Sequence, residues 1–260
     1  MKKAILVASF GSTYEQAIKN SIEQLENSIR NTFTEYDVFR VFTSERIVTS
    51  LYKRGIHTYT LEAALKELIT AGFDDVIVQP SLIIEGIEYD KIRTVADRYK
   101  AYFSCLKIGT PLLYSQSDVE RICSLFANKF RDKSDAIILM GHGTEHKANH
   151  IYNDFAEICT RLGYKHIFIV TACGALDASS VVPKLNEINC KDIILAPLLF
   201  VAGAHASNDM VSDKPDSIKS VLEAAGFSVK AVIKGLGEYE EVRQMYSEHL
   251  RKTIVDNTLI

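Results

Sequence analysis

Three loops carry the side chains of this chain that are best suited to bind a metal ion. His142 follows the apolar run 136–140 and stands between two glycines, while Glu88 and His205 each stand eight residues after a proline. Ligands of parallel α/β domains bind beyond the carboxyl ends of the strands, where such loops lie. Two imidazoles and one carboxylate suit Co²⁺, Fe²⁺, Ni²⁺ or Zn²⁺ and do not discriminate strongly among them. The sequence therefore predicts a metal site made by His142, Glu88 and His205.

The histidine loop also allows other interpretations. His142 could simply cap the next helix, and a loop carboxylate such as Glu88 is usually only solvated. His142, His146 and His150 recur every four residues, which would align them on one face of a helical zinc site if the helix began at the turn. The order lacks the HExxH pattern of a zinc hydrolase. We expect instead that Glu145 and His146 support His142, with His146 as a nearby proton acceptor or supporting group, and that His150 is an ordinary helical histidine.

Local charge and the first loop predict contacts to an anionic ligand. Residues 40–57 and 91–107 each contain several lysines and arginines against a single acidic residue. A polycarboxylate near the Glu88 loop would need such a rim, although a solvated helix face has the same composition. Beside Gly11, hydroxyl groups or backbone amides could contact a ligand carboxylate. The candidate substrate-binding residues are Ser9, Phe10, Ser12, Arg54 and Lys91.

Composition argues against several classes of function. A formal net charge of -3 gives no overall field that would attract nucleic acid or an anionic membrane. No GxSxG elbow, Walker lysine or complete dinucleotide glycine fingerprint is present. The apolar N-terminal run lacks a signal-peptide cleavage site, and no stretch reaches about 18 apolar residues, so we expect a cytoplasmic protein. The five cysteines are widely spaced without a CxxC pair, so we predict that they are reduced and mostly buried.

Short β-branched runs alternate with longer helical patterns along the chain. This alternation is typical of βα units around parallel sheets. The expected strands are 4–8, 36–43, 75–79, 102–108, 136–140, 166–171, 192–196 and 229–233.

The first half of the chain is repeated in the second half. The matched segments are 4–13 with 136–144, 36–44 with 164–172, and 75–88 with 192–205. The third match has no gap, so Glu88 falls on His205. The repeat predicts two similar α/β domains with parallel sheets, 1–128 and 129–260, with a cleft between them. A single continuous doubly wound sheet is the alternative.

The chain resembles a known family along essentially its whole length. The resemblance rests on the segments KKAILVASFGST, GIEYDKI, GHGTEHKANH and PLLFVAGAHASNDM. These segments are similar to those of the anaerobic-type cobalt chelatases of cobalamin synthesis, the sirohydrochlorin cobaltochelatases of the class II chelatase family. The resemblance implies two flavodoxin-like domains related by pseudo-twofold symmetry. It also implies that Co²⁺ is inserted into sirohydrochlorin or precorrin-2, that His142, Glu88 and His205 bind the metal, and that His142 accepts a proton.

The chemistry of that reaction fits these residues. Insertion of a divalent metal into a tetrapyrrole releases two pyrrole protons, and a neutral histidine can accept a proton near pH 7. The metal is a substrate, no organic cofactor is needed, and Fe²⁺ or Ni²⁺ are alternatives to Co²⁺. A non-catalytic carrier of metal or tetrapyrrole would need similar residues. The sequence also allows a homo-oligomer, and no nucleic acid or membrane partner is expected.

Overall fold

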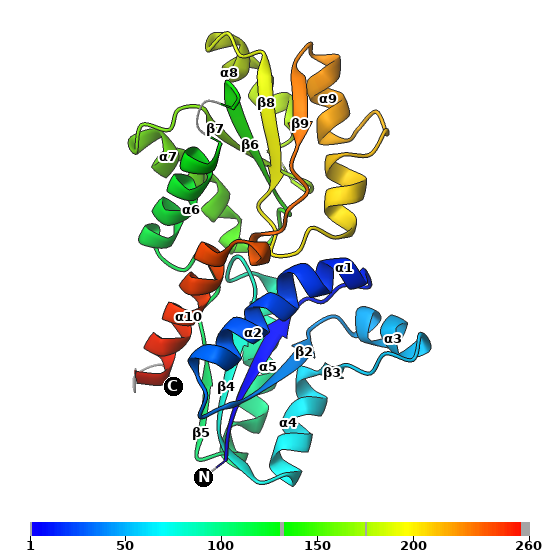
Figure 1. Cartoon of the computed structure of the whole chain (residues 1–260), viewed down its shortest axis with the longest axis vertical. Helices are drawn as coiled ribbons and strands as arrows, with labels where there is room; N and C mark the ends of the chain where they lie inside the picture. Colours follow the sequence, from blue (N-terminus) through cyan, green and yellow to red (C-terminus); the bar gives the residue numbers. More distant parts are fainter. Residues whose placement is uncertain (1, 131–132, 175, 256–260) are drawn as a thin grey trace. The chain divides into compact units, whose positions relative to one another are not determined.

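The computed structural model describes residues 2–130, 133–174 and 176–255. The chain forms two compact units, each built around its own sheet (Figure 1). The first unit combines Met1–Tyr114 with Gly237–Ile260, and the second unit is Ser115–Leu236. No helix within the described ranges is both long enough and apolar enough to cross a membrane.

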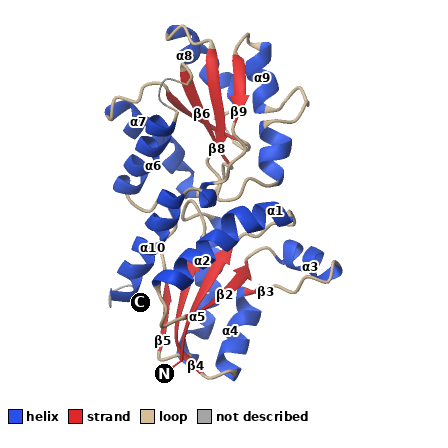
Figure 2. Cartoon of the chain, viewed as in Figure 1, coloured by secondary structure: helices blue, strands red, loops and turns tan. Residues whose placement is uncertain are grey.

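The first unit contains a five-stranded parallel sheet with the strand order β3-β2-β1-β4-β5 (Figure 2). Its strands are β1 (Lys2–Ser9), β2 (Asp37–Phe42), β3 (Tyr59–Thr60), β4 (Phe73–Pro80) and β5 (Cys105–Ile108). Its helices are α1 (Glu15–Ala17), the π-helical turn Ile18–Ile22, α2 (Glu23–Thr32), α3 (Glu45–Lys53), α4 (Leu61–Thr70), α5 (Ile87–Tyr99), the 3₁₀ turn Lys100–Tyr102 and α10 (Glu240–Val255).

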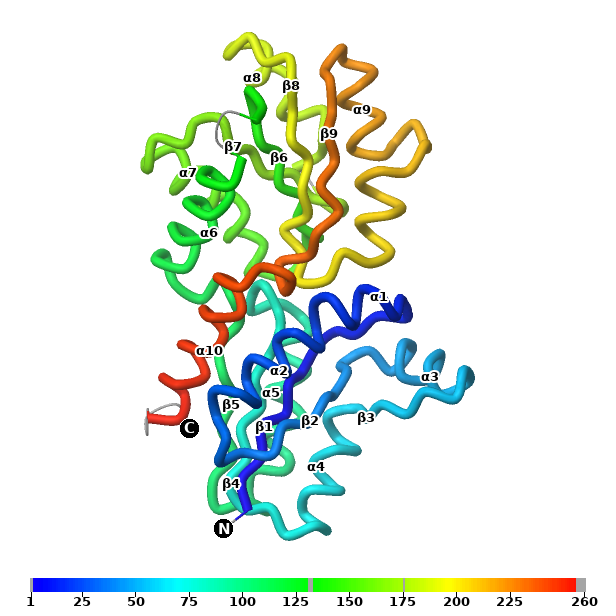
Figure 3. Tube along the Cα trace, viewed as in Figure 1, coloured from blue at the N-terminus to red at the C-terminus, as the bar shows by residue number. Residues whose placement is uncertain are grey.

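Helices cover both faces of this sheet because its central strands are apolar on both sides. Residues 4–8 of β1 are fully buried. On one face, side chains of α4 and α5, including Leu65 and Ile92, join the core formed with β1 and β4. On the other face, Leu25 and Ile29 of α2 are buried, and α10 packs beside α2 and β5 (Figure 3). The first unit is therefore a three-layer α/β/α structure.

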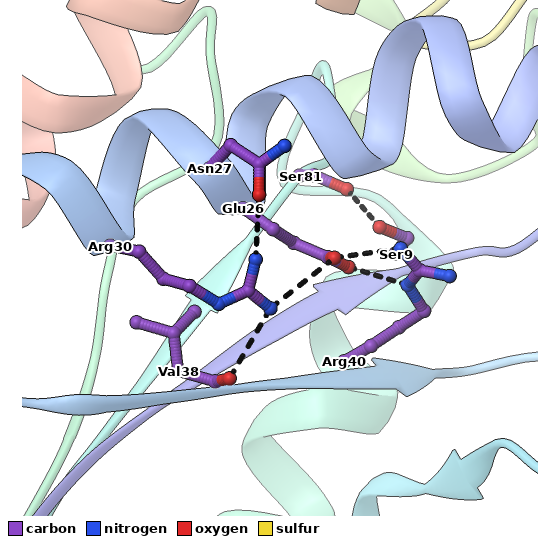
Figure 4. Close-up of polar contacts among 7 residues, drawn as sticks. All are labelled: Ser9, Glu26, Asn27, Arg30, Val38, Arg40 and Ser81. Atoms are coloured by element: carbon purple, nitrogen blue, oxygen red, sulfur yellow. Dashed lines mark hydrogen bonds and ion pairs between the residues drawn. The ribbon is translucent and has the colours of Figure 1, made fainter.

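A buried ion pair holds α2 to β2 in the first unit (Figure 4). Glu26 is 1% exposed, and both of its carboxylate oxygens accept hydrogen bonds from the Arg40 guanidinium, at 2.6 and 2.7 Å. Arg30 approaches the same carboxylate at 3.7 Å. The hydrogen bonds and charge of Glu26 raise the pKa of Arg40 despite the opposing effect of burial. The positive charge of Arg40 is thus balanced by Glu26, so Arg40 does not contribute a free cation to the basic segment 40–57.

The second unit contains a four-stranded parallel sheet with the order β7-β6-β8-β9. Its strands are β6 (Ala136–Gly141), β7 (Ile167–Thr171), β8 (Asp192–Pro197) and β9 (Ser228–Ala231). Its helical elements are α6 (Gln116–Lys129), the 3₁₀ turns Lys147–Asn149 and Ala178–Val181, α7 (His150–Arg161), α8 (Val182–Glu187), the π-helical turn Ala206–Met210 and α9 (Ile218–Ala224). One face of the sheet forms a core with α8, α9 and the π-helical turn, to which Leu185, Leu222 and Met210 contribute.

Strand order confirms the internal repeat. Without the two-residue strand β3, the first sheet has the order β2-β1-β4-β5, which corresponds strand for strand to β7-β6-β8-β9. The same backbone bond recurs in both units: Ser81 N–H donates to the Ala8 carbonyl at 2.8 Å, and Leu198 N–H donates to the Met140 carbonyl at 2.7 Å. These pairs are those that the sequence repeat matches. Two flavodoxin-like units are therefore present, and the single continuous sheet considered as an alternative is wrong.

The second match of the repeat is wrong by one residue. Ile5 pairs with Val38 in the first sheet, and Ile137 pairs with Ile167 in the second. Val38 therefore corresponds to Ile167, whereas the sequence match places it on His166. A slip of one residue would exchange the two faces of a strand, so the register settles the correspondence.

The division into units differs from the expected boundary between residues 128 and 129. Helix α6 packs against α7 in the second unit, where a disulfide joins Cys123 and Cys159. Helix α10 returns to the first unit, where the Lys107 ammonium donates to the Ile254 carbonyl at 3.1 Å. A sequence repeat locates the strands but does not show which sheet the flanking helices cover.

The disulfide makes the prediction of five reduced cysteines wrong for Cys123 and Cys159. Both residues are fully buried between two packed helices, and 36 positions separate them in sequence. Their pairing has no spacing signal because it depends on helix packing. Cys105, Cys173 and Cys190 are free thiols, and Cys173 is exposed rather than buried.

Candidate functional site

His142 and His205 lie at the point of the second sheet where the strand order reverses. Strands β6 and β8 are neighbours, and their connections leave toward opposite sides of the sheet. His142 is the first residue after β6, and His205 precedes the π-helical turn that follows β8. Ligands of open α/β sheets bind at this kind of switch point. The fold therefore places both histidines where a ligand is expected.

Close backbone packing shapes the loop that presents His142. Gly143 has a φ of +78°, and a Cβ atom there would overlap the Cys173 carbonyl. The Cys173 N–H in turn donates to the His142 carbonyl at 2.9 Å. A Cβ atom at Gly141 would overlap the ring of Tyr152, which is buried beneath the loop. The two glycines of the Gly-His-Gly segment are thus required by packing, and the histidine between them is left exposed.

The two imidazoles approach each other closely. Their ring centroids are 4.5 Å apart, with an angle of 84° between the ring planes. His142 Nδ1 lies 2.7 Å from the Gly143 carbonyl, and His205 Nδ1 lies 2.6 Å from Asp209 Oδ2. A carbonyl or carboxylate oxygen can only accept, so both Nδ1 atoms carry the hydrogen. In their neutral forms both rings therefore have a lone pair on Nε2.

This arrangement has the dimensions of a bis-imidazole metal site. A nitrogen–metal bond of about 2.1 Å would place each ring centroid about 3.2 Å from the cation. Two rings at bond angles between about 90° and 109° would then have centroids about 4.5 to 5.2 Å apart, and the observed separation lies at the lower end of this range. Histidines that bind metals almost always donate their other ring N–H to a carbonyl or a carboxylate. Both contacts are present at this site.

Asp209 belongs to the candidate site, although no sequence motif pointed to it. It lies four residues after His205, and its carboxylate holds the imidazole from one side. The signal was present in the sequence, because an Asp four residues after a His is a neighbour on a helical turn. The sequence did not predict the helical turn Ala206–Met210, so the four-residue spacing alone could not show that His205 and Asp209 are neighbours.

His146 and His150 occupy positions different from those of His142. His146 Nδ1 accepts a hydrogen bond from the Ala148 N–H at 3.1 Å and so caps the 3₁₀ turn before α7. His150 begins α7, and its Nε2 lies 3.6 Å from Asp154. Residues 142–146 are not helical, so the alignment of three histidines on one helical face is wrong. In this conformation His146 holds the loop that follows His142, and Glu145 is exposed in that loop.

Glu88 lies in the first turn of α5 in the first unit, two residues after the helix cap Gly86. Its Oε2 accepts a hydrogen bond from the Thr43 hydroxyl at 2.5 Å, and its Oε1 accepts one from the Lys91 ammonium at 2.6 Å. The Thr43 N–H donates to the Ser9 carbonyl at 2.8 Å, so the carboxylate is tied to the ends of β1 and β2. Glu88 is therefore held at the carboxyl end of its sheet.

The remaining substrate-binding candidates have different surroundings. The Ser9 hydroxyl is buried against Ser81 at 2.6 Å (Figure 4), and the Ser12 hydroxyl is buried and accepts a hydrogen bond from the Tyr14 N–H. Arg54 donates to the Thr13 carbonyl at 2.7 Å and forms an ion pair with Glu15 at the same distance. Phe10 is 49% exposed after β1. Phe10 and Lys91 are thus exposed to solvent, whereas the serine hydroxyls and Arg54 make contacts within the protein around the loop after β1.

Within the described parts of the chain, no group of three or more His, Cys, Asp or Glu side chains is gathered for a metal ion. The structure brings together two of the three predicted ligands, His142 and His205. Glu88 belongs to the other unit, and its participation stays a prediction.

Two flavodoxin-like units, with paired imidazoles at one switch point, define a two-domain α/β protein with a candidate metal site. Among solved structures, the chain is similar to SirB from Bacillus subtilis with Fe³⁺, at a TM-score of 0.65 and 17% identity, covering 98% of this chain and 96% of that one. This likeness shows the fold. Residues 3–255 match the model of the cobalt chelatase (CbiK) family, and the chain belongs to this family.

Two curated relatives agree with the family. The chain is 33% identical to the sirohydrochlorin cobaltochelatase of Salmonella typhimurium, covering 98% of this chain and 97% of the relative. It is 32% identical to the sirohydrochlorin cobaltochelatase CbiKC of Nitratidesulfovibrio vulgaris, covering 97% and 91%. The chain is therefore a metal chelatase with a divalent metal ion as substrate, as the resemblance in its motifs predicted.

Proposed function

We propose that this chain inserts Co²⁺ into sirohydrochlorin in cobalamin biosynthesis, with release of two protons. The membership in the cobalt chelatase family and the activity named for two full-length relatives support this function. The observation that supports this function most directly is the pair of imidazoles, His142 and His205. Both rings are held in the same tautomer, and their centroids lie 4.5 Å apart. Neutral imidazoles bind Co²⁺ reversibly, as a site that must pass its metal on requires.

His142 has two successive roles in this proposal. Its Nε2 first binds the cation together with Nε2 of His205. When the metal leaves for the macrocycle, the Nε2 atom of His142 is vacated and accepts a pyrrole proton. The bond from Nδ1 to the Gly143 carbonyl holds the neutral ring in the tautomer with a free Nε2, and it can persist in the imidazolium that forms when the proton arrives. The second pyrrole proton goes to another acceptor or to solvent.

Glu88 is proposed as the carboxylate ligand that completes the donor set, on the basis of its match to His205 in the repeat. We propose sirohydrochlorin as the substrate and keep precorrin-2 as the alternative macrocycle. Fe²⁺ and Ni²⁺ are alternative metals, because two imidazoles and a carboxylate follow the general divalent order of affinity. The cytoplasmic location and a homo-oligomeric state remain predictions from the sequence.

A turnover assay tests the function against the carrier alternative. A small amount of enzyme is mixed with excess sirohydrochlorin and excess Co²⁺, and the absorbance change of metallation is followed. A chelatase converts many equivalents of macrocycle, whereas a carrier binds about one equivalent and stops. Parallel assays with Fe²⁺, Ni²⁺ and precorrin-2 rank the alternatives by kcat/KM. A single equivalent with every metal and macrocycle would show that the chain is a carrier.

A further inference from the structure

Both carboxylate oxygens of Glu88 are already occupied in the first unit. Oε2 accepts the Thr43 hydroxyl and Oε1 accepts the Lys91 ammonium, at 2.5 and 2.6 Å. The two partners differ in charge and in exposure. Thr43 is neutral and is fixed through its backbone to β1, whereas the Lys91 side chain is 57% exposed and lies one helical turn further along α5.

These two contacts respond differently to a divalent cation. A hydroxyl that donates to one carboxylate oxygen is compatible with metal binding at the other oxygen. An ammonium on the metal-binding oxygen is not, because it would stand within a few ångströms of a doubly charged ion. A metal that binds Glu88 must therefore displace the Lys91 ammonium, while the Thr43 hydroxyl continues to hold the carboxylate.

Lys91 also lines a hollow of about 390 Å³ in the first unit, at the ends of β2 and β3 and between α4 and α5. The apolar part of its wall includes Phe42, Leu61 and Ile92. Two further cations, Lys66 and Arg98, line the same hollow.

The three cations of this hollow have different partners. Lys66 and Arg98 both pair with Glu62, at 3.0 and 3.2 Å, and Glu62 also accepts a hydrogen bond from the Tyr99 hydroxyl. These contacts lower the pKa of Glu62, so it stays ionised and keeps its two cations. Lys91 pairs instead with a carboxylate that is itself proposed to bind the metal. The release of the Lys91 ammonium from Glu88 would therefore be coupled to the binding of the metal ion by Glu88.

We propose that Lys91 is an exchangeable counter-ion of Glu88, which the incoming metal displaces and which then binds a carboxylate side chain of the tetrapyrrole at this hollow. The proposal rests on the proposed function, because it takes Glu88 as a metal ligand and a polycarboxylate macrocycle as the second substrate. By linkage, each substrate then strengthens the binding of the other through a single ammonium group. Before the metal arrives, the same ammonium neutralises the carboxylate.

The test compares Lys91→Met with Lys66→Met in steady-state metal insertion. Removal of the competing ammonium should lower KM for Co²⁺, by about three- to tenfold for a partly exposed pair. Loss of the carboxylate contact should raise KM for sirohydrochlorin by about the same factor. Lys66→Met lines the same hollow but pairs with Glu62, so both KM values should stay within about twofold.

Opposite changes of the two KM values are the signature of the exchange. A loss of folding or a distorted loop would raise both values together. The proposal is refuted if the folded Lys91→Met variant shows a rise in both values, no change in either, or the same pattern as Lys66→Met. The function itself is judged separately, because it requires only that the unaltered enzyme turns over. If the wild-type enzyme turns over and the Lys91→Met variant has the same two KM values, the exchange is refuted and the proposed function still stands.

Discussion

Removal of the Asp209 carboxylate should weaken metal binding without touching a metal ligand. In the structure this carboxylate holds His205 Nδ1 at 2.6 Å, the length of a charge-assisted hydrogen bond. Asp209→Ala leaves the ring free to rotate and to place its hydrogen on Nε2, the nitrogen that must bind the cation. The substitution therefore acts on the tautomer and orientation of His205.

The exposure of this pair sets the size of the effect. Loss of a hydrogen-bond partner behind a metal-binding histidine costs about 10- to 100-fold in affinity or activity. The side chains of His205 and Asp209 are 46% and 43% exposed, so water can replace part of the lost contact. We therefore expect the lower end, about a tenfold weaker binding of Co²⁺, or about 1.4 kcal/mol. Asp209→Asn keeps an acceptor oxygen and should lose less, about threefold.

The assay is calorimetric titration of each folded variant with Co²⁺, together with kcat/KM for insertion. Asp154→Ala is the matched control, because Asp154 lies near His150 at the same four-residue spacing but outside the candidate site. It should change neither quantity by more than about twofold. If Asp209→Ala binds Co²⁺ as tightly as the wild-type enzyme, the tautomer argument is wrong. Equal losses of Co²⁺ affinity in Asp209→Ala and Asp154→Ala would show that the effect comes from surface charge and not from the contact with His205.

Four further outcomes are expected. His142→Ala and His205→Ala should each abolish insertion while circular dichroism shows an intact fold, because both side chains are exposed and add little to a core; near-normal turnover would remove that residue from the mechanism. Gly143→Ala should lower the melting temperature as well as activity, because its Cβ would overlap a carbonyl and its φ is +78°; an unchanged melting temperature would contradict this. At pH 8 iodoacetamide should label the exposed Cys173 well before Cys190, because burial raises the pKa of the Cys190 thiol to about 11. Peptide mass spectrometry measures the two labelling rates, and equal rates would refute this expectation. Insertion should decline on acidification, because protons compete with metal for imidazole nitrogens, and an acidic limb in kcat that persists at saturating Co²⁺ would mark histidine as the base.

The sequence allowed the sheet architecture to be predicted because its central strands are buried on both faces. Runs such as 4–8 and 136–140 are continuously apolar, and the repeat preserved the order of the four main strands. Strand β3 was missed because two residues carry no periodic signal. The slip that matched Val38 to His166 arose because short apolar strands look alike when displaced by one position, and only pairing with β6 fixes the register.

The candidate site was predicted in its residue types and only partly in its supporting contacts. His142 and His205 follow strands that are neighbours in the sheet, so a correct fold class was enough to bring them together. The role of Asp209 depends on a short π-helical turn, and the cap made by His146 depends on a 3₁₀ turn. Neither turn has a sequence pattern as strong as a long amphipathic helix. The buried bond between Ser9 and Ser81 likewise depends on strands that are distant in sequence.

The central claim is that Nε2 of His142 and Nε2 of His205 together bind the metal substrate. Crystals of the enzyme with Co²⁺, measured at the cobalt absorption edge, test it directly through anomalous scattering. We expect one strong anomalous peak about 2.1 Å from both Nε2 atoms, with Nδ1 of His142 still bonded to the Gly143 carbonyl and Nδ1 of His205 still bonded to Asp209. A well-occupied peak that contacts neither imidazole, or that lies on an Nδ1 atom, would contradict it.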